Sequence, residues 1–120
     1  MKPYQDARGE GEKLAKQYAE LEQADQVDFY NGLEGYYSVL GHNKKQEAIA
    51  VLIEKNDHKI YVYQLDKGIS QDKAATISRE KGASDIDKVT FGRYQDKPIW
   101  EVKSGNQYYL VDFETGAVIQ

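Results

Sequence analysis

Residues 107–119 read QYYLVDFETGAVI, two apolar segments separated by a turn. In the first segment Tyr109, Val111 and Phe113 alternate with other residues, and this period of two places their side chains on one face of a β-strand. Residues 114–116 are typical of a tight turn, because Gly adopts backbone angles that other residues avoid. The stretch therefore predicts an antiparallel hairpin and a strand-rich fold.

Upstream of this hairpin the sequence predicts a helix and further strands. Ser70 is a residue type that caps helix N-termini, and Asp72 lies in the first turn, where the helix dipole favours a negative charge. Gly82 supplies a C-terminal stop. We expect a helix at about residues 70–82, followed by strands within residues 88–119.

The first half of the chain has the same order of patterns. Leu14, Tyr18 and Leu21 follow the helical step and predict a helix at about residues 12–25. Runs of β-branched and aromatic residues separated by turn residues then predict strands within residues 27–65.

These two halves predict an internal duplication and an α+β fold, with a first repeat at residues 1–67 and a second at residues 68–120. Each repeat is expected to pack one helix on a short antiparallel sheet. A copy of this size buries a small fraction of its surface, so we expect each copy to need the other. The segment 47–54 also has helix-forming residues, but its Ile and Val content favours a strand.

Composition excludes several classes of function. The 120-residue chain has a net charge of −4, so it lacks the basic surface that binds nucleic acid or an anionic membrane. It has no Cys, which excludes disulfides, zinc–thiolate sites and thiol catalysis. The longest apolar run, residues 48–53, has the length of a strand and not of a membrane span.

The residues for catalysis are also sparse. His42 and His58 both lie in polar turns, and neither has a second ligand at helical spacing. The serines show no nucleophile motif. We therefore expect no enzymatic activity, no metal and no cofactor.

The second half resembles a PepSY domain. Residues 108–119, with an aspartate before a Thr-Gly turn, resemble the end of that domain, residues 70–75 resemble its helix start, and residues 100–102 its central strand. In tandem with a more divergent first unit, this resembles the YpmB-like proteins of Gram-positive bacteria. The nearest equivalent of the turn in the first half, residues 63–68, lacks the Thr-Gly pair.

This resemblance implies two cystatin-like repeats without enzymatic activity. It implies a binding or regulatory module outside the cytoplasmic membrane, held by an N-terminal anchor that this sequence does not contain. The partner implied is a protein or peptide, with a peptidase as one candidate, because similar domains occur in peptidase propeptides. The alternatives are a structural spacer between membrane and cell wall, and a small-molecule carrier or enzyme with a pocket between helix and sheet.

The turn of the second half contains one set of candidate residues. Asp112, Thr115 and Gly116 are expected to have a structural role in the turn, where Gly tolerates positive φ and the side chains accept from backbone N–H groups.

Tyr is the residue type present in excess, with ten copies. We hypothesise that Tyr61, Tyr63 and Tyr108 form an outward-facing aromatic patch that contacts a partner, since Tyr combines contact area with a polar tip. The alternative is that they cover the groove between helix and sheet, or the junction of the repeats.

Overall fold

The computed structural model describes residues 12–17, 19–32 and 35–119. The chain divides into two compact units, Met1–Gln64 and Leu65–Gln120, and each is described by itself. The boundary lies three residues before the one expected after residue 67. No helix among the described residues is long and apolar enough to cross a membrane.

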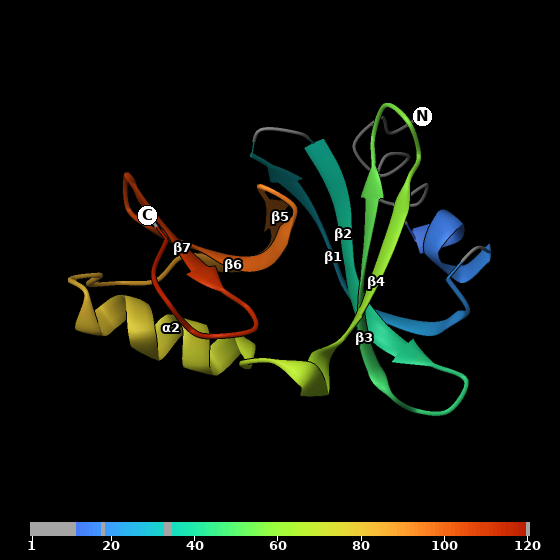
Figure 1. Ribbon diagram of the computed structural model, residues 1–120, viewed down its shortest axis with the longest axis horizontal. Coiled ribbons are helices and arrows are strands. Elements are labelled where there is room, and N and C mark those ends of the chain that lie inside the picture. Colours follow the sequence, from blue (N-terminus) through green and yellow to red (C-terminus); the bar gives the residue numbers. More distant parts are fainter. Residues whose placement is uncertain (1–11, 18, 33–34, 120) are drawn as a thin grey trace. The chain divides into compact units, whose positions relative to one another are not determined.

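The first unit contains a four-stranded antiparallel meander (Figure 1). Its strands follow chain order across the sheet. They are β1 (Leu21–Asn31), β2 (Gly35–Asn43), β3 (Ala48–Glu54) and β4 (Ile60–Gln64). The segment that also had helix-forming residues is thus strand β3, and all of its residues except Ala48 are buried. A central strand buried on both faces favours β-branched and aliphatic residues over an alternating pattern.

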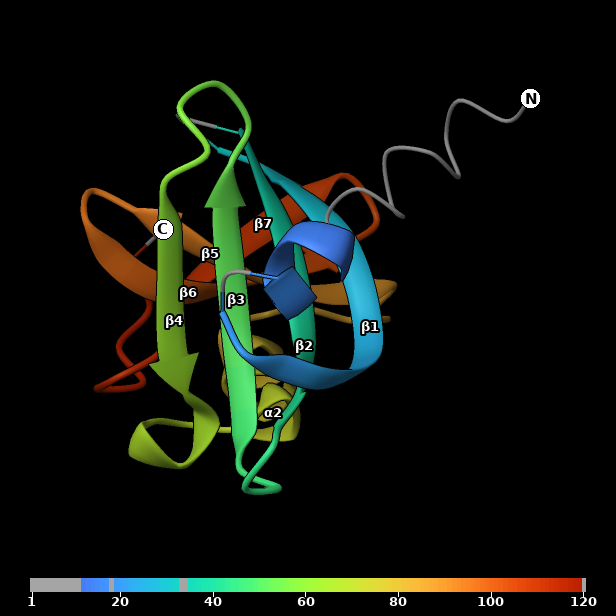
Figure 2. The ribbon, with the colours of Figure 1, turned by 90° about the vertical axis from the view of Figure 1, so that its right-hand side faces the viewer.

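One face of this sheet packs against the helical turn at residues 12–17, which lies in front of the strands in Figure 2. Ala15 from the helix is fully buried against it, and Leu14 packs at its margin. The sheet contributes mostly β-branched residues to this core: Val27, Val39, Ile49, Val51 and Ile53, together with Leu21 and Tyr37.

The helix expected at residues 12–25 is wrong in its second half, because β1 begins at Leu21. Glu20 has a positive φ of 57°, a backbone conformation that ends a right-handed helix. Leu21 is only 4% exposed and joins the core from the sheet and not from the helix. Tyr18, and the expected positions before residue 12, lie outside the described residues.

The second unit packs one helix on a three-stranded antiparallel sheet. After a short 3-10 turn, η1 (Leu65–Lys67), come α2 (Gln71–Glu80), β5 (Lys88–Tyr94), β6 (Lys97–Ser104) and β7 (Gln107–Asp112). Ser70 is the N-cap of α2, as the sequence predicts, and its hydroxyl accepts from the Lys73 N–H at 3.0 Å. The expected last strand at residues 117–119 is reduced to one bridge between Val111 and Val118.

The core of the second unit is an aromatic cluster. The Phe91 ring meets the Trp100 and Phe113 rings edge-on, with centroids 4.9 and 5.2 Å apart. The indole Nε1 of Trp100 donates to the Ile69 carbonyl at 3.0 Å, which fixes the chain just before α2. Both units thus combine helix with antiparallel sheet, and the predicted α+β class is confirmed.

Candidate functional site

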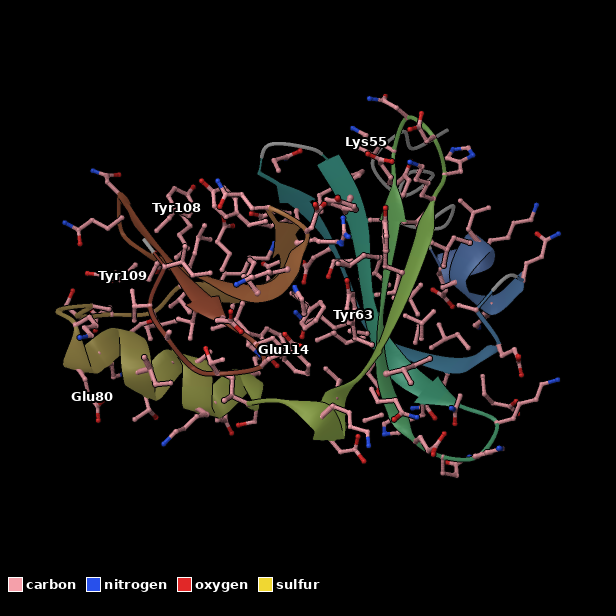
Figure 3. The ribbon with its side chains drawn as sticks, in the orientation of Figure 1. Lys55, Tyr63, Glu80, Tyr108, Tyr109 and Glu114 are labelled. Carbon is pink, nitrogen blue, oxygen red and sulfur yellow. The ribbon has the colours of Figure 1, made fainter. Side chains whose placement is uncertain are left out.

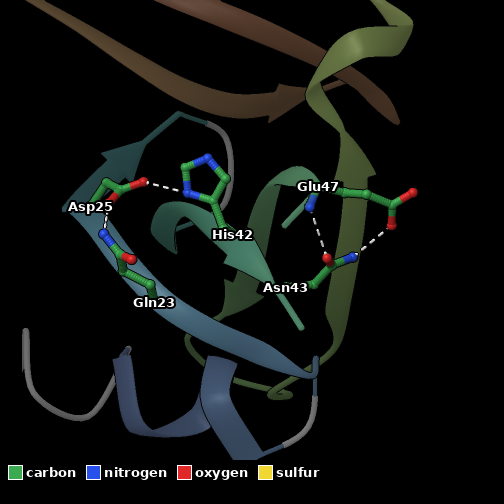
Figure 4. A network of polar contacts seen from close by, with 5 residues as sticks. All are labelled: Gln23, Asp25, His42, Asn43 and Glu47. Atoms are coloured by element: carbon green, nitrogen blue, oxygen red, sulfur yellow. Dashed lines mark hydrogen bonds and ion pairs between the residues drawn. The ribbon is translucent and has the colours of Figure 1, made fainter. Parts of the chain in front are cut away.

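Catalytic and metal chemistry is the first class of site to consider. The described part of the chain has no group of three or more His, Asp, Glu or Cys side chains that could hold a metal ion. The fold does give His42 a partner that sequence spacing did not indicate: its Nδ1 lies 2.9 Å from Asp25 Oδ2 (Figure 4). Gln23 Nε2 donates to the other Asp25 oxygen at 2.8 Å. This pair is half-exposed and links β1 to β2, so it is a surface contact between neighbouring strands.

The predicted turn residues form a connected set of hydrogen bonds. Asp112 Oδ1 accepts from the Glu114 N–H at 2.8 Å and from the Thr115 N–H at 3.1 Å. Thr115 Oγ1 accepts from the Ala117 N–H at 3.1 Å. Gly116 has a φ of 82°, and its N–H donates to the Asp112 carbonyl at 2.8 Å. Asp112 itself is 6% exposed, so its carboxylate is used inside the turn.

The three candidate tyrosines come from two different units. Tyr61 and Tyr63 lie on the same face of β4, and the Tyr61 ring meets Tyr36 edge-on at 6.3 Å. This face is opposite to the one that packs on the helical turn, since Ile60 on the other face joins that core. The groove between helix and sheet is therefore not where these two residues lie. A partner-binding role for them stays a prediction.

Tyr108 is on β7 of the second unit and is 54% exposed (Figure 3). Strand register places it beside Lys103, which in turn pairs with Lys88. In the next row on this face, burial raises the pKa of Glu101, while the positive charge of Lys88 lowers it by a smaller amount.

Sequence reasoning missed a feature at the β4 edge of the first sheet. β4 is the last strand of that sheet, and its Val62 is 48% exposed although it lies on the core-facing side. At the start of β4, beside Ile60, is a pocket of about 220 Å³, which is lined by Leu14, Ile53, His58 and Ile60. Alternation already placed Ile60 and Val62 on one face, but nothing in the sequence indicated that their strand ends the sheet.

Comparisons with known proteins agree with this fold. A family model described as "Cell wall elongation regulator TseB-like domain" matches residues 10–54. The protein described as "Probable cell wall elongation regulator TseB" from Bacillus subtilis is 38% identical over 114 residues, which are 88% of this chain and 70% of the relative. The solved structure of the YpmB protein from Bacillus subtilis has a TM-score of 0.78 at 34% identity, covering 93% of each chain.

These matches confirm the resemblance to YpmB-like proteins. The named relative is a regulator and not an enzyme, in agreement with the expectation that this chain is not an enzyme. With 38% identity to a relative of which it covers 70%, the chain belongs to the TseB-like family of cell wall elongation regulators.

Proposed function

We propose that this chain is a non-catalytic regulatory module of the cell envelope, which acts by binding a protein of the cell wall elongation machinery. The observation that carries the proposal is the 38% identity, across 88% of the chain, to a relative described as a regulator of cell wall elongation. The surface chemistry supports it, since the described residues offer aromatic and aliphatic groups at the surface and no group of metal ligands.

Replacement of TseB in Bacillus subtilis tests this function. The full-length protein that carries this chain is expressed in cells that lack TseB, and the rate of cell elongation is measured together with the incorporation of a fluorescent D-amino acid into the side wall. We expect the replacement to restore both quantities. A matched strain carries Trp100→Ala, which removes the ring at the centre of the second core. Failure of the intact protein at equal abundance would contradict the proposal.

The proposed location is outside the cytoplasmic membrane, held there by an anchor. It is supported by the wall-related description of the relative. Because the chain has no Cys, a single Cys introduced at the exposed turn residue Asn106 is the one thiol within this chain. We expect a membrane-impermeant maleimide to label Asn106→Cys in intact cells. Labelling that requires cell lysis would place the protein in the cytoplasm.

We also propose that the two units are cystatin-like repeats related to PepSY domains. The support is the shared order: a helical turn before β1–β4, and α2 before β5–β7. Restraint of a peptidase is the finer functional proposal, and it rests on the PepSY resemblance of the second half alone. Adding the purified chain to a thermolysin-type peptidase tests it: slower cleavage of a peptide substrate is expected, and an unchanged rate at saturating chain would refute it.

A further inference from the structure

The two edges of the first sheet differ in how they are protected. β1 has acidic residues, among them Glu22, Asp25 and Asp28, and its pairing with β2 contains two register shifts. Charges and bulges of this kind discourage another strand from pairing with an edge. β4, with the sequence IYVYQ, has no charge, no proline and no register shift. Of the two edge strands, β4 is therefore the one without features that oppose pairing with a further strand.

The backbone N–H and C=O groups of β4 alternate between facing β3 and facing away from it. Glu54 N–H donates to the Lys59 carbonyl, so the alternation of an antiparallel pair makes Tyr61 and Tyr63 the residues that bond to β3. The N–H and C=O groups of Ile60, Val62 and Gln64 then point away from the sheet. These are the groups that an added strand would bond, as in recognition by strand addition.

The side chains beside this edge define what the added strand carries. Ile60 and Val62 project on the core-facing side, and the pocket of about 220 Å³ lies next to Ile60, between Leu14 and His58. The pocket is partly open to solvent, and His58 adds a polar side to its aliphatic lining, while its volume leaves room for one aliphatic side chain. A residue paired with Ile60 would extend the row Ile53–Ile60 and reach the pocket.

The turn before β4 determines what the end of the added strand meets. All strand pairs of this sheet are antiparallel, and an added antiparallel strand brings its C-terminal end to the turn at residues 55–59. In this turn Lys59 directly precedes Ile60 and is exposed, whereas Lys55, labelled in Figure 3, places its ammonium 4.9 Å from the ring of Phe29 on β1 and so lies away from this edge. An acidic residue at the end of the added strand would be attracted to Lys59.

We propose that β4 binds an extended peptide segment of a partner protein as an added antiparallel strand. One aliphatic side chain of that segment enters the pocket beside Ile60, a second covers Val62, and an acidic residue follows towards the turn at residues 55–59. This inference rests on the proposed function, namely that the chain works by binding a protein.

A synthetic probe tests the edge without knowledge of the natural partner. The probe is the fluorescein-labelled peptide Thr-Thr-Val-Thr-Leu-Thr-Glu, in which Leu is designed to pair with Ile60 and Val with Val62. Binding is measured by fluorescence anisotropy, and hydrogen exchange of the Val62 N–H is followed by NMR. We expect binding to slow the exchange of this amide. Replacement of Leu by Ala in the probe should weaken binding about tenfold.

Two N-methylated probes provide a matched pair that leaves the protein unchanged. Methylation of the Val and Leu nitrogens removes the N–H groups that would face β4. Methylation of the Thr nitrogens at the second and fourth positions of the probe alters groups that face away. We expect the first change to weaken binding about tenfold or more and the second to have little effect. On the protein, Val62→Pro should weaken binding about tenfold, because it removes an outward N–H while the bonds to β3 remain. Val62→Thr is the matched control and should bind within about threefold of the original protein.

Three results would overturn the proposal. One is hydrogen exchange of the Val62 amide that is not slowed by about 1 mM probe, a concentration that would reveal binding with a Kd of about 1 mM. Another is equal binding of the two methylated probes. The last is protection of Val62 that rises with protein concentration without probe, which would make the occupant a second copy of the chain. If the probe binds but the TseB replacement fails, the proposed function is wrong and the edge site stands. If Val62→Pro still replaces TseB, the function stands and the edge is not its binding surface.

Discussion

The core of the second unit is built around the aromatic rings of Phe91, Trp100 and Phe113, whereas the sheet of the first unit contributes mostly β-branched residues to its core. The fully buried helix residues are small in both units: Ala15 in the first, and Ala74, Ala75 and Ser78 in the second. Small side chains on a helix leave room for large ones on the facing sheet, so that the core is filled at normal density. The two units therefore share an order of elements and small buried helix residues, and they differ in the type of side chain that fills the rest of the core.

The two helices also differ in what ends them. α2 has an N-cap at Ser70 and is followed by Gly82 with a φ of 116°. The helix of the first unit is ended by Glu20, a non-glycine residue at positive φ, and the chain enters β1 at once. Local sequence signals thus set the limits of the second helix, and packing of Leu21 into the sheet sets the limit of the first.

The largest expected effect is on the aromatic core. Trp100→Ala should cost about 3–5 kcal/mol, because it removes a fully buried ring and the bond to the Ile69 carbonyl. Amide hydrogen exchange should show a greater loss of protection in β6 and β7 than in β2 and β3. Trp100→Phe, which keeps a ring, is the control and should lose less. An equal loss in both sheets would show that the two cores unfold as one.

A second variant tests the close approach of β1 and β2 at Gly41 in the first unit. A Cβ at Gly41 would clash with the Gln23 carbonyl oxygen, next to a register shift between β1 and β2. Gly41→Ala should cost about 1–3 kcal/mol in urea unfolding, the usual range for overpacking. The matched control is Gly35→Ala in the same strand, where the nearest atom is the flexible Lys55 Cδ at 3.1 Å. Similar stabilities for the two variants would mean that the close approach is not a constraint.

The cap of α2 should have a smaller effect. Ser70→Ala removes the acceptor for the Lys73 N–H and should cost about 1 kcal/mol. Ser70→Asp keeps an acceptor at this position and should retain most of the stability in a thermal melt. If both variants melt like the original protein, the second helix is held by its packing alone.

The smallest effect concerns Glu101, whose pKa is raised because burial disfavours its charged form. A folded-state pKa above the unfolded one contributes stability that is present at low pH and lost as the pH rises through the folded value. Glu101→Gln should therefore be more stable than the original protein at pH 7, by less than about 0.5 kcal/mol because the group is only half-buried.

That advantage should vanish below the ordinary pKa of 4.5. Urea unfolding across this pH range is the measurement, and Glu80→Gln at an exposed site is the control. A constant difference at all pH values would assign the effect of Glu101 to packing and not to its charge.

The sequence by itself determined the features that depend on neighbours along the chain. The alternation of residues 107–113 and the cap at Ser70 indicated the strand and helix types, because a period of two and a capping hydroxyl are local properties. The same local patterns carried the resemblance to YpmB-like proteins that the comparisons confirm.

Only the tertiary structure decided which strand ends a sheet and which side chains meet across it. The pairing of His42 with Asp25, the exposure of Val62 and the pocket between Leu14 and Ile60 depend on the strand order from β1 to β4. The helical step assigned Leu21 to the first helix, and its burial in the sheet selected the strand. Periodicity fixes which face of an element is apolar, whereas the partner of that face is chosen by contacts between residues far apart in the chain.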